Sequence, residues 1–104
     1  MYRSNSYDED FSKDMQDPVA RREYLLALIH DEDEPMSVEE ALRFTIRRMG
    51  TVEFADLAGE KKQNVDKFLS GERNLKRETL DKYLEPFGLR TVIDVKPIDE
   101  KEVA

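Results

Sequence analysis

The strongest constraint on this chain is a pair of short amphipathic segments joined by a glycine-containing turn. Within residues 62–70, apolar side chains recur at the helical spacing of three and four positions: Val65, Phe68 and Leu69. The segment before it, residues 52–58, also carries an apolar face, and residues 59–61 leave room only for a tight turn between the two. The sequence therefore predicts two short helices that pack on a shared core.

The opposite face of the 62–70 segment carries polar side chains that can donate hydrogen bonds to phosphates and base edges: Lys62, Gln63, Asn64 and Lys67. Lysine reaches phosphates and guanine acceptors, and the two amides can pair bidentately with adenine. Two short helices joined by a turn of three or four residues form the helix-turn-helix pattern, whose second helix enters the DNA major groove. The alternative is an ordinary solvated helix face.

The distribution of charge favours contact with phosphate. Residues 61–77 hold six bases and two acids, a net charge of +4, within a chain of net charge −7. A positive segment in an acidic protein is most simply explained by a nucleic-acid partner. Residues 1–36 carry ten acids and only four bases. Two explanations stay open for this acidic part: it binds a different partner, or it keeps the chain in solution.

Composition excludes several functional classes. The 104 residues suffice for one small core, and 38% hydrophobic with 39% charged residues suits a helical domain. The chain has no cysteine and a single histidine, His30, so we expect no enzyme, no cofactor and no metal site. No apolar run approaches the roughly 18 residues of a membrane span. We therefore expect a cytoplasmic protein without a membrane partner.

Capping residues mark two helices in the first half of the chain. Asp17-Pro18 begins a helix that runs to about His30, because Asp is a good N-cap and Pro suits the first helical position. Ser37 and Glu40, three residues apart, form a capping box for the next helix, which ends at Gly50. Both helices have apolar stripes that predict packing against the same core.

The second half is expected to contain three helices. Thr51 is the predicted N-cap of helix 52–58, and the 62–70 segment follows it. A last helix covers about residues 75–84, after which Pro86, lacking an N–H, should distort the final turn. Gly88 then closes it.

Residues 90–96 have a different pattern, rich in β-branched side chains and bounded by Gly88 and Pro97, which is typical of a strand. We find no second strand in the sequence, and a lone strand leaves its backbone groups unpaired. We therefore predict antiparallel pairing with a second copy about a two-fold axis, through Thr91, Val92, Ile93 and Val95. Pairing with the N-terminal arm, or packing flat on the helices, are the alternatives.

These segments predict an all-α fold with one helical domain. We expect a flexible arm at residues 1–16, where no periodicity is found, and a helix-turn-helix domain at residues 17–90. The dimerisation strand would occupy residues 91–96, and residues 97–104 would form a flexible tail.

Parts of the chain resemble helix-turn-helix proteins of the Xre or lambda-repressor type. The likeness is carried by Thr51-Val-Glu-Phe-Ala-Asp-Leu-Ala-Gly59, Val65-Asp-Lys-Phe-Leu-Ser-Gly71, Asn74 and Thr79–Leu89. The layout of residues 7–96 is similar to that of HigA-like antitoxins, the antidote proteins of toxin–antitoxin modules. The further matching features are Asp17-Pro18, Tyr24-Leu25, the acids 31–34 and Gly88-Leu89-Arg90 with the strand after it.

The resemblance implies a five-helix, lambda-repressor-like domain that dimerises and represses its own operon by binding operator DNA. It also implies neutralisation of a small basic toxin, a RelE- or HigB-like ribonuclease. The positions that match base and phosphate readers are Lys62, Gln63, Asn64 and Lys67, and those that match backbone contacts are Thr51, Arg73 and Asn74. We add three bases beside the same surface, at helix N-terminal ends: Lys61, Lys76 and Arg77.

The chain departs from the family pattern at Glu60, where an apolar residue is usual, and at Lys61, where Ser or Thr usually caps the recognition helix. For the toxin we expect contacts from the acidic front and the wide apolar surface of the first helix: Tyr7, Phe11, Tyr24, Leu25 and Leu28. A stand-alone Xre-type regulator, or a helix-turn-helix-shaped interaction module that does not read DNA, are the alternatives.

Overall fold

The computed structural model describes residues 6–71 and 75–98, and all regular structure within these ranges is helical. The elements follow in the order α1 (Glu9–Asp14), α2 (Pro18–Ile29), α3 (Val38–Met49), α4 (Thr51–Ala58), α5 (Lys62–Leu69), α6 (Arg77–Leu84) and the 3₁₀ turn η1 (Glu85–Phe87). The prediction of an all-α fold is confirmed for these residues. None of their helices has the length and apolar character needed to cross a bilayer.

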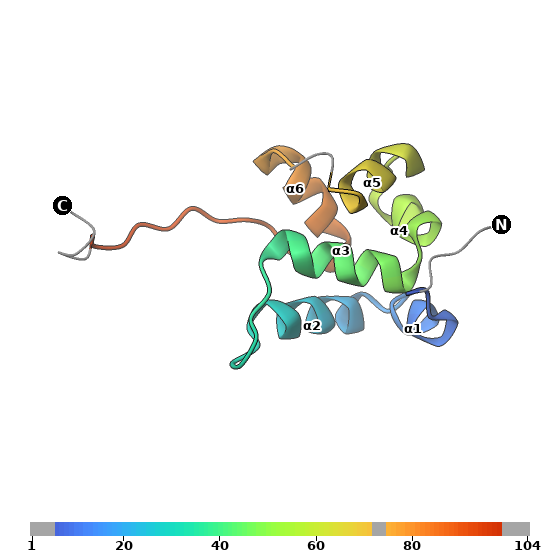
Figure 1. Cartoon of the computed structure of the whole chain (residues 1–104), viewed down its shortest axis with the longest axis horizontal. Coiled ribbons are helices and arrows are strands. Elements are labelled where there is room, and N and C mark those ends of the chain that lie inside the picture. The colour runs from blue at the N-terminus through green and yellow to red at the C-terminus, as the bar shows by residue number, and fades with distance from the viewer. Residues whose placement is uncertain (1–5, 72–74, 99–104) are drawn as a thin grey trace.

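Helix α3 lies at the centre of the fold. It packs against α1 and α2 on one side and against α4 and α5 on the other (Figure 1). The η1 turn contacts α2, α4 and α6, so the end of the chain's helical part closes back onto its beginning. Figure 1 shows the result as two tiers, with α1 and α2 below α3 and with α4, α5 and α6 above it.

Four aromatic side chains form the part of the core that positions the upper tier. Phe54, Phe68 and Phe87 are fully buried and Tyr83 is 1% exposed. The Tyr83 ring lies 5.4 Å from that of Phe54 and 5.3 Å from that of Phe68, measured between centroids. Because these rings come from α4, α5, α6 and η1, one cluster fixes all four elements relative to each other.

The caps predicted for α2 and α3 are confirmed. Asp17 accepts a hydrogen bond from the backbone N–H of Ala20 at 3.3 Å, and Ser37 Oγ accepts one from the N–H of Glu40 at 3.2 Å. The predicted cap of α4 is wrong, because Thr51 is already the first helical residue. Gly50, with a φ of +107°, ends α3 and begins α4 directly, so no residue remains between them to act as a side-chain cap.

The expectation of an arm without regular structure is wrong for residues 9–14, which form α1. Asp8 caps this helix by accepting a hydrogen bond from the N–H of Phe11 at 3.1 Å, and its own N–H donates to the carbonyl of Arg48 at 2.9 Å. Phe11 and Met15 are 7% and 4% exposed and belong to the core. A six-residue helix is too short to show a helical period in the sequence.

The end of the chain matches the sequence only in part. Pro86 distorts the last turn as expected, since Glu85–Phe87 is a 3₁₀ turn that Gly88 ends with a φ of +70°. No strand is assigned at residues 91–98, which run away from the helices (Figure 1). A strand needs a neighbour for its backbone hydrogen bonds, and the described part of a single chain offers none. Pairing across a dimer stays a prediction.

A buried arginine joins the beginning and the end of the helical domain. Arg21 is 7% exposed, and its Nε donates to the carbonyl of Pro86 at 2.6 Å. Its Nη1 donates to the carbonyls of Met15 and Gln16 at 3.0 and 3.2 Å. One guanidinium therefore satisfies the last carbonyls of α1 and the bend at η1.

Replacing this guanidinium should destabilise the whole fold. We expect Arg21→Met to lower the free energy of unfolding by about 2–3 kcal/mol, because three carbonyls lose a charged donor in a nearly dry site. Urea denaturation followed by circular dichroism measures this. Arg22→Met is the matched control, since the Arg22 side chain is 40% exposed and its pair with exposed Glu23 is long, at 3.9 Å. Its effect should stay within about 0.5 kcal/mol.

Candidate nucleic-acid interface

Helix α5 presents the polar face that the sequence predicts. Val65 and Phe68 are fully buried, whereas the side chains of Lys61, Lys62, Gln63 and Lys67 are exposed. The apolar stripe thus holds the helix on the core and leaves its long polar side chains in solvent. The exposure of these residues agrees with the prediction; their contact with DNA stays a prediction.

Two arginines of α3 hold the C-terminal end of α5. Arg43 Nε donates to the carbonyl of Phe68 at 2.9 Å, and Arg47 donates to the carbonyl of Leu69. The Arg43 guanidinium also lies 4.5 Å from the centroid of the Phe68 ring. Cations are stabilised at a helix C-terminus, where carbonyls lack intrahelical partners. Helix α5 is thereby fixed to α3 by charged donors as well as by its apolar face.

Glu60 holds the other end of α5. Its Oε1 accepts hydrogen bonds from the N–H of Lys61 at 2.9 Å and from Asn64 Nδ2 at 3.0 Å. Its Oε2 lies 3.3 Å from Nζ of Lys82 on α6. The hydrogen bond from Asn64, followed by that from Lys61, lowers the pKa of Glu60 below its usual value. Glu60 therefore replaces the usual apolar residue by forming a polar clamp between α5 and α6. Its negative charge lies at the N-terminus of α5, where a helix favours an anion.

The clamp changes the role available to Asn64. This side chain is half-buried and donates to Glu60, so it would have to leave that bond to read a base; its contact with DNA stays a prediction. Lys62 Nζ lies 2.8 Å from Oδ2 of Asp66 one turn away, in an exposed pair that a phosphate can displace. Gln63 remains as the exposed amide of α5.

The other predicted DNA contacts surround this helix unevenly. Thr51 is half-buried in the first turn of α4, whereas Lys76 and Arg77 are exposed at the start of α6. Arg77 Nε donates to Thr91 Oγ1 at 3.1 Å. Arg73 and Asn74 lie outside the described residues.

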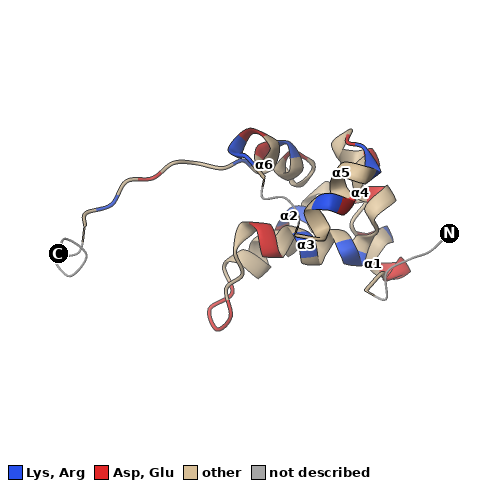
Figure 2. Cartoon of the chain, turned by 45° about the horizontal axis from the view of Figure 1, so that its top comes forward, with Lys and Arg blue, Asp and Glu red and all other residues tan. Residues whose placement is uncertain are grey.

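Charge is unevenly distributed over the described part of the molecule, with both signs present on α5 and α6 (Figure 2). The upper tier exposes a group of bases on and beside α5 and α6: Lys61, Lys62, Lys67, Lys76, Arg77 and Lys82. The same tier also exposes the acids Asp56, Asp66, Glu78 and Glu85. In residues 6–50 the exposed acids are Glu9, Asp10, Asp14, Asp17, Glu23, Asp31, Glu32, Asp33, Glu34 and Glu40, while Lys13 alone is an exposed base there. Most arginines of residues 6–50 donate to carbonyls or contact rings. Three of them also pair with acids: Arg22 with Glu23, Arg43 with Glu39 and Arg48 with Asp8.

Arg48 illustrates this inward use of charge. Its guanidinium lies 4.2 Å from the centroid of the Phe11 ring and donates to the hydroxyl of Tyr24 at 3.1 Å. Asp8 Oδ2 lies 3.6 Å from the same group. The hydrogen bond to Tyr24, and after it the attraction of Asp8, raise the pKa of Arg48. Helices α1, α2 and α3 are joined at this one side chain.

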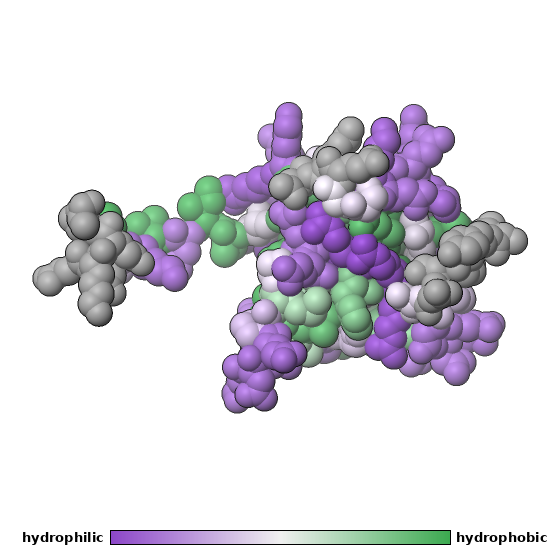
Figure 3. Space-filling model, in the orientation of Figure 1, coloured by the Kyte–Doolittle hydropathy of each residue, from purple (hydrophilic) through white to green (hydrophobic). Residues whose placement is uncertain are grey.

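The predicted partner-binding residues need correction. Leu25 is fully buried and Phe11 is 7% exposed, so neither offers its side chain to a partner. Tyr7, Tyr24 and Leu28 are half-buried. The sequence reading missed Phe44, which is 46% exposed on α3. Figure 3 shows an apolar area on the face formed by α2 and α3.

Phe44 was detectable as an apolar residue outside the inward stripe of α3, the stripe of Ala41, Leu42, Thr45, Ile46 and Met49. It lies one turn from Arg48, which contacts Tyr24, and Leu28 lies one turn from Tyr24. This spacing places Leu28 and Phe44 on the faces of α2 and α3 that carry Tyr24 and Arg48, whose hydrogen bond joins the two helices. We call this group (Tyr24, Leu28 and Phe44) the seam patch.

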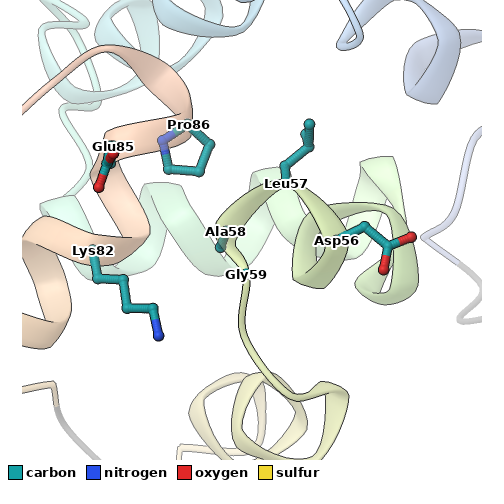
Figure 4. Close-up of a pocket in the computed structure, with 7 residues that line it drawn as sticks. All are labelled: Asp56, Leu57, Ala58, Gly59, Lys82, Glu85 and Pro86. Atoms are coloured by element: carbon teal, nitrogen blue, oxygen red, sulfur yellow. The ribbon is translucent and has the colours of Figure 1, made fainter.

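A shallow hollow of about 350 Å³ lies between the end of α4 and the segment of α6 and η1. Figure 4 shows Asp56, Leu57, Ala58 and Gly59 on one side, with Lys82, Glu85 and Pro86 opposite. Lys82 is already paired with Glu60 across this junction. The hollow therefore lies at the junction of α4 with α6 and η1, which the Lys82–Glu60 pair spans.

Comparison of the chain with protein-family models, with curated proteins and with solved structures gave no match. The geometry of the described residues therefore carries the functional argument.

The clamp at Glu60 predicts a pH-dependent contribution to stability. Because its pKa is lowered in the folded state, the ionised group stabilises the fold above the ordinary glutamate pKa of about 4.3. That contribution is lost as the pH falls through the lower folded value. We expect Glu60→Gln to cost about 1–2 kcal/mol at pH 7, and the difference from wild type to shrink below about pH 4. Urea denaturation across pH 3–7 measures it.

Glu85→Gln is the control for this experiment, because Glu85 is exposed in η1. Its effect on the free energy of unfolding should be small at every pH. A Glu60→Gln deficit that stays constant down to pH 3 would show that the carboxylate's charge plays no part in the clamp.

Proposed function

We propose that the chain is a DNA-binding repressor of the Xre type, in which α4 and α5 form a helix-turn-helix and α5 reads the major groove of operator DNA. The observation that carries this proposal is the exposed Gln63 between exposed lysines, on a helix clamped at both ends. A base-reading helix must be held rigidly for its side chains to select a sequence. The arginines of α3 and the Glu60 clamp supply that rigidity.

In this proposal the residues on and beside α5 have three different roles. Gln63 would pair with adenine, and Lys61, Lys62 and Lys67 would contact phosphates on either side. Lys76, at the N-terminal end of α6, would add a further backbone contact. Asn64 is assigned a structural role through Glu60 in place of the reading role expected from the sequence.

We further propose that the chain acts as an antitoxin, a homodimer that also binds a small basic ribonuclease toxin. This part rests on the resemblance to HigA-like proteins and on the acidic surface of residues 6–50. That surface, together with the seam patch, suits a basic protein surface, whereas the exposed lysines on and beside α5 suit DNA. Both roles belong in the cytoplasm.

An interaction module that does not read DNA is the competing function, favoured by the net charge of −7. Exposed Lys61 and Lys67 on either side of Gln63 argue against it, although Lys62 is paired with Asp66 and Lys82 with Glu60. Salt dependence separates the two, because phosphate contacts weaken steeply as salt rises.

DNA binding is tested with duplexes from upstream of the chain's own reading frame, by gel shift at two salt concentrations. Gln63→Ala should reduce the preference for the operator over unrelated DNA by about tenfold, the value of one bidentate pair. Lys67→Ala should weaken binding to all sequences and lower the salt slope by about one. Lys13→Ala, an exposed base on α1, is the matched control. Unchanged operator affinity in both Gln63→Ala and Lys62→Ala would mean that α5 is not the reading helix.

Toxin binding is tested with the product of the adjacent reading frame by titration calorimetry. Deleting residues 1–36 would be uninformative, because α1 and α2 supply Phe11 and Leu25 to the core. Phe44→Ser should instead weaken binding about tenfold or more while leaving DNA binding intact. Val19→Ser is the control, since Val19 is 53% exposed on α2 but about 140° around the helix from Tyr24. Equal affinity of both variants and wild type would exclude the seam patch.

A further inference from the structure

An apolar groove lies at the root of the C-terminal segment. Its volume is about 330 Å³, and its apolar lining comes from α2, α3, the end of α6 and the segment itself: Leu26, Ile29, Val38, Leu84, Leu89 and Val92. It lies on the flank of α2 away from the seam patch, because Leu26 and Tyr24 differ by two positions and so by about 200° around the helix. The groove is therefore separate from both surfaces described above.

The segment that leaves this groove is apolar and exposed. Val92, Ile93, Val95 and Ile98 are 74%, 75%, 87% and 69% exposed. In an extended chain, alternate side chains share a side, so Ile93, Val95 and Pro97 form one wholly apolar edge. The other edge is broken by Asp94 and Lys96. One edge of this segment is thus suited to burial and the other to water.

The root of the segment is fixed in place. Asp81 Oδ1 accepts hydrogen bonds from the N–H of Thr91 at 2.6 Å and from its hydroxyl at 2.8 Å. These bonds, the backbone one first, lower the pKa of Asp81. From this anchor the segment runs away from the helices (Figure 1), so its outer residues do not cover the groove of their own chain.

We propose that the groove binds the C-terminal segment of a second copy, with Ile93 and Val95 of each chain seated against Leu26, Ile29 and Leu89 of the other. This inference deepens the dimer of the proposed function and rests on it. In this arrangement each chain gives its C-terminal segment to the groove of the other, so the same two surfaces meet twice, as a two-fold interface requires. The apolar edge of both segments is then buried.

Charge complementarity supports a second copy as the occupant. His30 lines the groove, and the four exposed acids of residues 31–34 follow it directly in the chain. The segment brings the exposed base Lys96 one residue beyond Val95. A docked segment would place Lys96 toward these acids while its apolar edge enters the groove. Antiparallel pairing of the two segments with each other is compatible with this arrangement, because pairing uses backbone groups and docking uses side chains.

Cysteine cross-linking tests the exchange directly, since the natural chain contains no cysteine. Leu26→Cys, carrying a tag that increases its mass, is mixed with untagged Val95→Cys and oxidised. We expect a disulfide-linked species of mixed mass on a non-reducing gel. Val19→Cys replaces Leu26→Cys in the control and should give none, because Val19 is exposed outside the groove. Absence of the mixed species, or its equal formation in the control, would overturn the inference.

A second measurement separates docking from strand pairing alone. Sedimentation equilibrium of Leu26→Glu should show dimerisation weakened about tenfold or more, whereas Asp94→Ser should dimerise like wild type. Circular dichroism verifies that both variants are folded. If wild type dimerises and Leu26→Glu dimerises equally well, the groove is not the site and the proposed dimer stands. If wild type is monomeric at all concentrations, the groove docking and the proposed dimer are both wrong. The gel-shift experiment with Gln63→Ala tests DNA reading independently of this result.

Discussion

The upper tier of this fold depends on one cluster of four aromatic rings. Helices α4, α5 and α6 have eight residues each, well below the roughly 12–15 residues at which an isolated helix becomes stable in water. None of them can therefore persist alone, and Phe54, Phe68, Tyr83 and Phe87 supply the burial that makes them one unit. A surface built on such short helices is rigid only while that cluster is intact, so any reading surface on α5 derives its geometry from the core.

Arginine and lysine are used for different purposes in this chain. The guanidinium has several donors in a fixed plane and stacks on rings, so Arg21, Arg43 and Arg48 satisfy carbonyls and contact aromatic faces inside the fold. Lysine has a compact charge on a flexible stem, and the lysines of α5 and α6 lie at the surface. Some acids of residues 6–50 pair with arginines, as Asp8 does with Arg48 and Glu39 with Arg43, but exposed acids still outnumber exposed bases there. A net charge alone cannot reveal this division, because it counts buried and exposed charges equally.

The sequence was most informative where local chemistry determines the structure. Capping at Asp17 and Ser37 and the apolar stripe of α5 were predictable from spacing, because each depends on residues within four positions. The errors arose where tertiary contacts decide. Helix α1 is stabilised by Arg48 from α3, and Glu60 is accommodated by Lys82 from α6. The seam patch likewise depends on how α2 and α3 pack, which turns Leu25 inward and Phe44 outward. For the candidate site, the exposure of Gln63 followed from the sequence, but the diversion of Asn64 to Glu60 did not.

Helix α6 is bonded both to the Glu60 clamp of α5 and to the root of the C-terminal segment. On one side Lys82 reaches Glu60 and through it the N-terminus of α5; on the other, Asp81 anchors Thr91 at the root of the C-terminal segment. Adjacent residues of a helix point about 100° apart, so these two bonds face different neighbours from the same turn. If two copies exchange their C-terminal segments, each segment would hold the α6 of its own chain in place relative to the other chain. The bond between Lys82 and Glu60 would then hold α5 in place relative to α6. The separation of the two α5 helices in the dimer would then be fixed through one turn of α6, because Thr91 and Glu60 are bonded to its consecutive residues Asp81 and Lys82.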